Sequence, residues 1–141
     1  MTSLDKAQWI VHKRMLENDA FSKWMEIEVV ALSLGSCTLI ARIRQEMLNG
    51  FGIAHGGITY ALADSALAFA SNSHGLKAVS IETSISHTKP VHLNDTIQAN
   101  AVEKNLTKHI GIYEVILTNQ HGQTVALFKG TVYRSGESWE L

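Results

Sequence analysis

The chain has 141 residues, of which 45% are hydrophobic and 18% charged, enough for one compact domain and too little for two ordinary ones. Twelve Lys and Arg residues nearly balance 13 Asp and Glu residues, so the formal net charge is -1. Such a surface carries no field of one sign, and we expect neither nucleic acid nor a membrane as a partner.

The cysteine content and the hydropathy predict a compartment. Cys37 is the single cysteine and has no partner for an internal disulfide. Residues 1–6 lack the apolar stretch of a secretory signal, and no segment offers the roughly 20 apolar residues that cross a bilayer. We therefore expect a cytoplasmic protein in a reducing environment.

The first predicted element is an amphipathic helix over residues 4–18, inside a helical segment that spans residues 1–24. Apolar side chains recur near one face of this helix. The period then changes to two, which is typical of half-buried strands. Short, turn-like connections separate the later strands and favour antiparallel neighbours, because a parallel crossover needs about a dozen residues. The predicted strands are residues 27–29, 37–43, 79–85, 97–101, 110–118 and 125–133.

Between the second and third of these strands, residues 57–72 are rich in alanine and leucine and predict a helix. Its apolar residues run almost all round, so it must be covered on most sides. Five or six antiparallel strands wrapped round one buried helix would cover it. The predicted fold class is α+β, with residues 1–141 as a single domain.

Asp64 is the only charged residue in this apolar helix. A carboxylate in such surroundings is costly unless it is hydrogen-bonded, paired or open to a cleft. It can lie on a thin exposed strip with Ser65 or bond to nearby backbone, in which case it is structural. The functional interpretation is a general base or nucleophile whose pKa is raised by its apolar setting.

A glycine-rich segment, residues 49–57, leads into the start of the same helix. Free N–H groups at a helix start can hydrogen-bond a carbonyl oxygen that gains negative charge, and glycine lets a substrate approach the backbone closely. Taken with Asp64, this segment predicts an oxyanion site.

The spacing of the two features predicts a dimer. Asp64 follows Gly56 by eight residues, which places them roughly 12 Å apart along a helix. A base and an oxyanion donor that serve one reacting carbon must each lie within about 3 Å of the groups they serve. A two-fold dimer with antiparallel helices would place Gly56 of one subunit beside Asp64 of the other.

These residues carry a family resemblance. The run Asn49-Gly50-x-Gly52-x-x-His55-Gly56-Gly57, followed by Leu62-Ala63-Asp64-x-Ala66, resembles the signature of hotdog-fold acyl-CoA thioesterases of the phenylacetate-degradation (PaaI) type. The resemblance extends over most of the chain. It implies a hotdog fold and hydrolysis of an acyl-CoA, such as phenylacetyl- or hydroxyphenylacetyl-CoA, to the free acid and CoA.

The resemblance also implies roles for single residues. Asp64 is the catalytic base or nucleophile, and the Gly56 N–H polarises the thioester carbonyl. Asn49, from the chain opposite Asp64, positions the water or the thioester, while His55 supports the loop or lies near the carbonyl. Gly57 and Ser80, which helps to hold the attacking water, are expected to contact substrate. Apart from the resemblance, we expect Tyr60 to contact substrate by lining the acyl pocket, unless it only fills the core. Lys108, one of four lysines near strand ends, is expected to meet the CoA phosphates. Family members form homodimers with shared active sites, and many are homotetramers.

Other chemistries find little support in the sequence. No two histidines stand at a metalloprotease-like helical spacing, Cys37 has no partner for a zinc knuckle, and no Gly-x-Ser-x-Gly elbow occurs. We expect no metal and no organic cofactor, since CoA is part of the substrate. Two alternatives stay open: a hotdog-fold enoyl-thioester hydratase or dehydratase, and a non-catalytic acyl-CoA-binding module.

Overall fold

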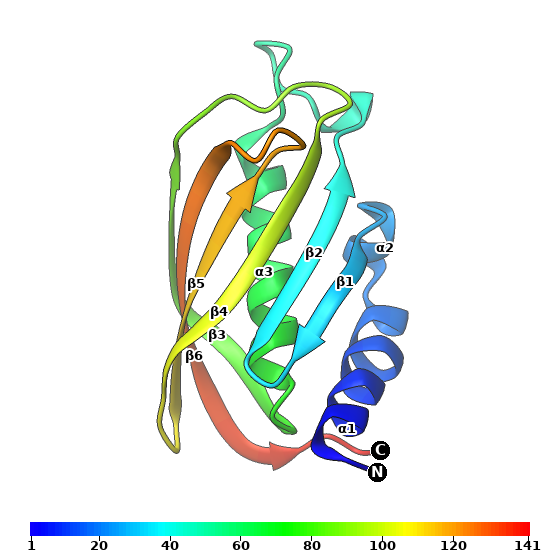
Figure 1. The fold of residues 1–141 in the computed structure, drawn as a ribbon, viewed down its shortest axis with the longest axis vertical. Coiled ribbons are helices and arrows are strands. Elements are labelled where there is room, and N and C mark those ends of the chain that lie inside the picture. Colours follow the sequence, from blue (N-terminus) through cyan, green and yellow to red (C-terminus); the bar gives the residue numbers. More distant parts are fainter.

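A computed structural model describes all 141 residues, and in it a curved sheet wraps around one long helix (Figure 1). The N-terminal helices lie beside the sheet, and both termini lie at the same end of the molecule (Figure 1). The elements in chain order are α1 (Ser3–Trp9), the π-helical η1 (Ile10–Met15), the 3₁₀ turn η2 (Leu16–Asn18), α2 (Ala20–Trp24), β1 (Glu28–Ser33), β2 (Ser36–Arg42), the 3₁₀ turn η3 (Gln45–Met47), α3 (Gly56–Asn72), β3 (Leu76–His87), β4 (Thr96–Leu106), β5 (Ile110–Thr118) and β6 (Thr124–Ser138).

The sheet has six strands in the order β1-β2-β4-β5-β6-β3, and every neighbouring pair is antiparallel. The α+β class and all six strands are therefore as predicted; β5 has its predicted range, β2 is shifted by one residue, and the other four strands extend beyond theirs. The strand order was not predictable from the sequence, because β3, which follows α3 in the chain, pairs with the last strand, β6, at the far edge of the sheet. Strands β1 and β3 are the two edges.

The N-terminal helix predicted over residues 4–18 is present, but its hydrogen-bond pattern changes twice. A capping box between Thr2 and Asp5 begins α1, with the Asp5 N–H donating to the Thr2 hydroxyl at 3.0 Å. The helix then widens into η1 and tightens into η2. Hydrophobic periodicity does not distinguish these helix types, so the change was not predicted.

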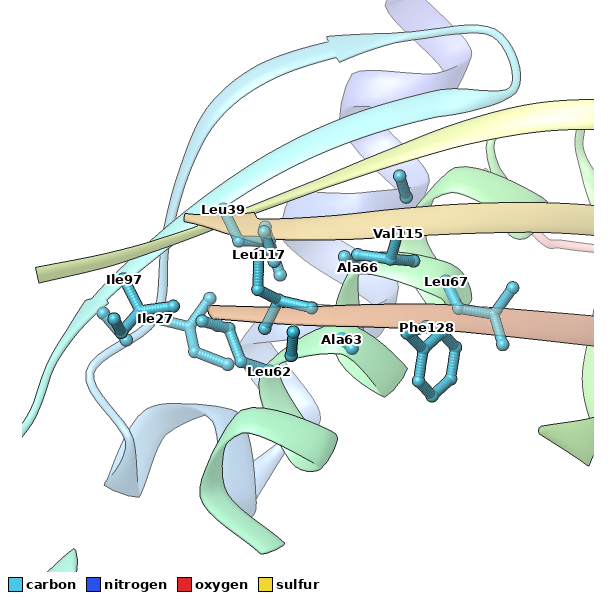
Figure 2. Packing of buried hydrophobic residues seen from close by; sticks show 14 of the residues in the cluster. Ile27, Leu39, Leu62, Ala63, Ala66, Leu67, Ile97, Val115, Leu117 and Phe128 are labelled. Carbon is cyan, nitrogen blue, oxygen red and sulfur yellow. The ribbon is translucent and has the colours of Figure 1, made fainter. Parts of the chain in front are cut away.

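The core lies between α3 and the concave face of the sheet. Leu62, Ala66 and Leu67 of α3 meet Val115 and other inward side chains of the strands (Figure 2). Their alternation along each strand follows from the two-residue period of β structure. The remaining labelled members of this cluster are Ile27, Leu39, Ala63, Ile97, Leu117 and Phe128.

Two small residues show how tightly the strands surround the helix. A Cβ atom at Gly130 would lie 2.5 Å from Leu67 Cδ2, so only glycine lets the helix approach β6 this closely. Cys37 of β2 is also buried in the core, and this burial raises the pKa of its thiol to about 12.

The edge strand β3 is long and exposes apolar side chains. Val79 is 65% exposed and Ile81 is 58% exposed. The register with β6 shifts between Ser80 and Glu82, so the strand bulges at Ile81. An edge of this kind is a template for pairing with another strand. No helix of the chain is both long enough and apolar enough to span a membrane.

Candidate active site

Asp64 lies near the middle of α3 on a strip that the sheet leaves uncovered. The half-buried residues of this strip are Tyr60, Ala61, Asp64, Ser65 and Ala68. Asp64 therefore does share a strip with Ser65, which is one part of the structural interpretation. The other part does not hold, because the Asp64 carboxylate makes no hydrogen bond or ion pair within the chain.

The pKa of Asp64 is raised, first by burial and then by the negative charge of Asp19. Asp19 begins α2 and accepts hydrogen bonds from the Ser22 N–H at 2.9 Å and the Ser22 hydroxyl at 2.6 Å. The Ser22 Oγ in turn lies 3.1 Å from Ser65 Oγ. These contacts hold the N-terminal segment, with its second carboxylate, against α3. No pattern in the sequence predicted that Asp19 lies close enough to Asp64 to influence it.

Asp64 opens into a cavity of about 380 Å³, called here the Asp64 hollow. Ser80 of β3 lines the same hollow, as do Leu67 and Ala68 of α3. Asp64 and Ser80, both predicted site residues, are thus brought together. The other lining residues are Met15, Ser71, Asn72, Lys77, Ala78, Val79, Val132 and Trp139.

The loop before α3 is fixed by Asn49. Its Oδ1 accepts hydrogen bonds from the Phe51 N–H at 2.9 Å and the Ile53 N–H at 3.4 Å. Gly52 has φ +77°, a conformation that glycine adopts without strain. With Oδ1 occupied inside the loop, the Nδ2 amide of Asn49 has no partner in the chain and is a free donor.

The first turn of α3 leaves one backbone donor free. His55 caps the helix: its Nδ1 accepts from the Gly57 N–H at 2.9 Å, and its carbonyl accepts from the Ile58 N–H at 2.9 Å. The Gly56 N–H makes no hydrogen bond in the chain. Since His55 Nδ1 is an acceptor, the neutral ring carries its proton on Nε2. The Gly57 N–H is therefore occupied by the His55 cap, whereas the Gly56 N–H is free to bind a ligand.

Asn49 and Gly56 line a second cavity of about 310 Å³, called here the Gly56 hollow. Asp64 does not line it, and neither Asn49 nor Gly56 lines the Asp64 hollow. The other lining residues are Ile53, Ala54, Thr59, His87, Thr88, Lys89, Pro90 and Val91. Within one chain, the Asp64 carboxylate and the free Gly56 N–H therefore belong to different cavities.

His87 and Thr59 are residues of the Gly56 hollow that sequence reasoning missed. The Thr59 hydroxyl donates to the Gly56 carbonyl at 3.0 Å, and His87 Nε2 lies 2.9 Å from the same hydroxyl. One hydroxyl proton cannot serve both partners, so His87 donates from Nε2. Strand alternation from Ile85 would have placed His87 on the helix-facing side of β3.

Tyr60 and Lys108 line neither hollow. The Tyr60 hydroxyl shares a hydrogen bond with the Thr83 hydroxyl, and its ring packs edge-on against Phe128 with centroids 5.5 Å apart. Lys108 is exposed in the connection between β4 and β5. Their expected contacts with substrate stay predictions.

Comparison with known proteins assigns the family. The chain belongs to the thioesterase superfamily, whose sequence profile matches residues 51–126, and it is therefore a thioester hydrolase by class. Acyl-coenzyme A thioesterase PaaI of Escherichia coli K12 is 37% identical to it over 128 residues, covering 91% of each chain. The predicted resemblance to PaaI-type thioesterases is thus confirmed.

Solved structures agree with this assignment. The E. coli PaaI protein from the phenylacetic acid degradation operon matches with a TM-score of 0.94 at 36% identity, covering 97% of this chain and 99% of that one. A Streptococcus mutans protein bound to acetyl CoA matches with a TM-score of 0.78 at 27% identity, covering 80% and 91%. The hotdog fold is therefore confirmed.

Proposed function

We propose that the chain hydrolyses acyl-CoA thioesters to a carboxylic acid and free CoA. The observation that carries this proposal is that the groups needed for thioester hydrolysis lie in two separate cavities of the chain. The Asp64 hollow offers a half-buried, unpaired carboxylate, and the Gly56 hollow offers a free backbone N–H with the free amide of Asn49 beside it. The similarity to an acyl-coenzyme A thioesterase supports the same reaction.

Each residue then has a chemical task. Asp64 removes a proton from water, or attacks the thioester carbon itself, while the Ser80 hydroxyl helps to hold that water. The Gly56 N–H and the Asn49 Nδ2 stabilise the negative charge that develops on the thioester oxygen. His55 keeps the loop in place by capping α3. The proposed reaction uses side chains, backbone and water, with no metal or organic cofactor.

The two halves meet in a homodimer. Val79 and Ser80 lie on the free edge of the sheet and also line the Asp64 hollow. A partner that pairs along β3 therefore reaches this hollow directly, and antiparallel pairing brings the partner's Gly56 end toward Asp64. We propose two equivalent active sites per dimer. Pairing of two dimers into a tetramer stays a prediction.

The two hollows differ in the parts of the substrate they suit. The Asp64 hollow is lined mostly by apolar residues, whereas half of the residues that line the Gly56 hollow are polar, including Lys89 and His87. We assign the acyl group to the first and the start of the CoA arm to the second. At about 380 Å³ the acyl hollow is near the lower end of the roughly 300–1,000 Å³ of ligand pockets. This size favours a compact acyl group such as phenylacetyl or hydroxyphenylacetyl.

Release of free thiol from acyl-CoAs tests the proposal. Phenylacetyl-, hydroxyphenylacetyl-, benzoyl-, hexanoyl- and crotonyl-CoA would be compared with wild type, Asp64→Asn and the control Glu114→Gln, whose exposed carboxylate lies on β5. We expect Asp64→Asn to lower kcat by about 10²- to 10⁴-fold, the usual contribution of a general base, with the control unchanged. Crotonyl-CoA that loses its double-bond absorbance without thiol release would instead indicate a hydratase. Binding without either signal would indicate a binding module.

A further inference from the structure

The Asp64 hollow continues along α3 beyond the carboxylate. Leu67, Ala68, Ser71 and Asn72 line it in sequence, so it follows the helix for eight residues from Asp64, or about 12 Å. Ala68 and Ser71 are small and leave this length of the hollow open. An acyl group whose carbonyl lies at Asp64 would therefore extend toward the C-terminal end of α3.

Trp139, from the segment after β6, stands at that far end. Its indole Nε1–H donates to Asn72 Oδ1 at 2.8 Å, and its backbone N–H donates to the Gly75 carbonyl at 2.9 Å. The Lys77 ammonium lies 5.3 Å from the ring centroid, within cation–π range. The indole is thus held on three sides by residues at the end of α3 and the start of β3.

Asn72, the anchor of the indole, has every polar atom occupied. Its Nδ2 donates to the carbonyls of Ala68 at 2.8 Å and Ala78 at 3.0 Å, and its Oδ1 also accepts from the Ala78 N–H at 2.9 Å. Asn72 is buried, with 2% of its surface exposed. Moving the indole would cost the buried Asn72 Oδ1 one of its two hydrogen bonds, so this contact favours the observed position of the indole. The end of the hollow therefore presents an aromatic surface to the acyl group, and the side-chain amide of Asn72 is not free to bind it.

We propose that Trp139 is a specificity-determining residue that closes the acyl end of the hollow and limits the length of the acyl group. This inference rests on the proposed function. The substrate class it defines is a short or compact aromatic acyl thioester, which stacks on the indole and does not pass it. Met15 of η1 lines the same hollow and ties its width to the N-terminal segment.

The test is a length series of straight-chain acyl-CoAs from butyryl to dodecanoyl, with phenylacetyl-CoA alongside. Trp139→Ala removes the wall, and we expect the ratio of kcat/KM for decanoyl- to butyryl-CoA to rise at least about tenfold, since exclusion of a single methylene can be worth that much. Trp9→Ala is the matched control, because Trp9 is 37% exposed on α1 and lines neither hollow. A folded Trp139→Ala enzyme with the wild-type ratio would overturn the proposal.

A filling substitution tests the same wall from the other side. Ala68→Leu places a larger side chain between Asp64 and Trp139, so we expect the preferred length to shorten and the decanoyl-to-butyryl ratio to fall. This variant keeps Trp139 and its contacts, so it tests the direction of the hollow even if Trp139→Ala fails to fold. An unchanged profile in folded Ala68→Leu would show that the acyl group does not run along α3.

Binding separates this inference from the proposed hydrolysis. In the Asp64→Asn background, calorimetry would give the Kd of each acyl-CoA with and without Trp139→Ala. If Trp139→Ala increases the longest acyl chain that binds tightly, the proposed wall is supported even if the wild type releases no thiol from any substrate. Turnover that depends on Asp64, with a length limit that ignores Trp139, would refute the wall and leave the thioesterase assignment intact.

Discussion

The two hollows on α3 differ in the groups that they offer to a ligand. The Gly56 hollow is built from a loop whose hydrogen bonds are almost all satisfied internally, so that its two free donors, the Gly56 N–H and the Asn49 amide, are held still. The Asp64 hollow is built from side chains on a helix and an edge strand, and its carboxylate has no partner at all. One site is preorganised for negative charge, and the other makes negative charge costly.

Under the proposed function, neither hollow completes the reaction by itself. Within one chain, Asp64 has no hydrogen-bond donor beside it, and the Gly56 N–H has no carboxylate beside it. The eight residues between them on α3 keep the two groups apart. The proposed dimer would bring them together.

After loss of Asp64 itself, the largest expected effect is loss of the free Gly56 donor. Gly56→Pro deletes the N–H, and the fold accommodates it because proline suits the first position of a helix and His55, with φ -58° and ψ 136°, has the backbone expected before proline. We expect kcat to fall by about 10²- to 10³-fold, as for loss of one oxyanion donor. Gly56→Ala keeps the N–H and adds a Cβ atom 3.2 Å from His87 Cε1, so it controls for bulk. Equal losses of kcat in both variants would show that the Gly56 N–H does not contribute to the reaction.

Mixing two inactive variants tests whether the hollows act across a dimer. In a heterodimer of Asp64→Asn and Gly56→Pro chains, one of the two composite sites keeps both an intact Asp64 and an intact Gly56. Random pairing makes half of the dimers mixed, so co-expression should restore roughly a quarter of wild-type activity. Co-expressed chains as inactive as the separate variants would place each complete site within a single chain.

The acid limb of the pH–rate profile tests the influence of Asp19. Burial and the Asp19 charge both raise the pKa of Asp64, so activity should rise with pH as Asp64 loses its proton at a raised pKa. Asp19→Asn removes the charge and keeps an acceptor for the Ser22 N–H. We expect the acid limb of kcat/KM to move to lower pH but to stay above the position of an unperturbed carboxyl, because burial is the larger cause. A limb that stays in place would show that the two carboxylates do not interact.

The smallest expected effect is on stability. The raised pKa of Asp64 means that the folded state is favoured below the usual pKa of a carboxyl and loses that advantage as pH rises through the folded-state value. Asp64→Asn should therefore raise Tm by a few degrees at neutral pH, with no gain at pH 3. Asp5 is the opposite case, because hydrogen bonds with Thr2 lower its pKa, so Asp5→Asn should not raise Tm. A Tm of Asp64→Asn below that of wild type at pH 7 would contradict this account.

Local patterns in the sequence predicted the elements well, because hydrophobic periodicity and turn residues are local signals. They predicted α3 and all six strands, and they predicted that Asp64 is a charged residue on an otherwise apolar helix. They also separated Gly56 from Asp64 correctly, since that separation follows from helical rise alone.

Features that depend on distant parts of the chain were not predicted. Ser22, which binds Asp19, contacts Ser65 across 43 residues of sequence, and Trp139 contacts Asn72 across 67. No periodicity encodes such contacts, which arise from how the N-terminal segment and the end of β6 fold back on α3. His87 was accessible in principle from strand alternation, since it follows Ile85 by two residues, but it lies beyond the predicted end of that strand at residue 85.

The burial of Cys37 has a practical consequence for the assay chemistry. It is the only cysteine in the chain, it is 1% exposed, and its pKa of about 12 leaves almost no thiolate at the pH of a thiol titration. Disulfide reagents react with thiolates, so the folded enzyme contributes no background to them. Any thiol that a colorimetric reagent counts in a reaction mixture is therefore coenzyme A released from substrate, and a slow rise in signal without substrate reports unfolding of the protein.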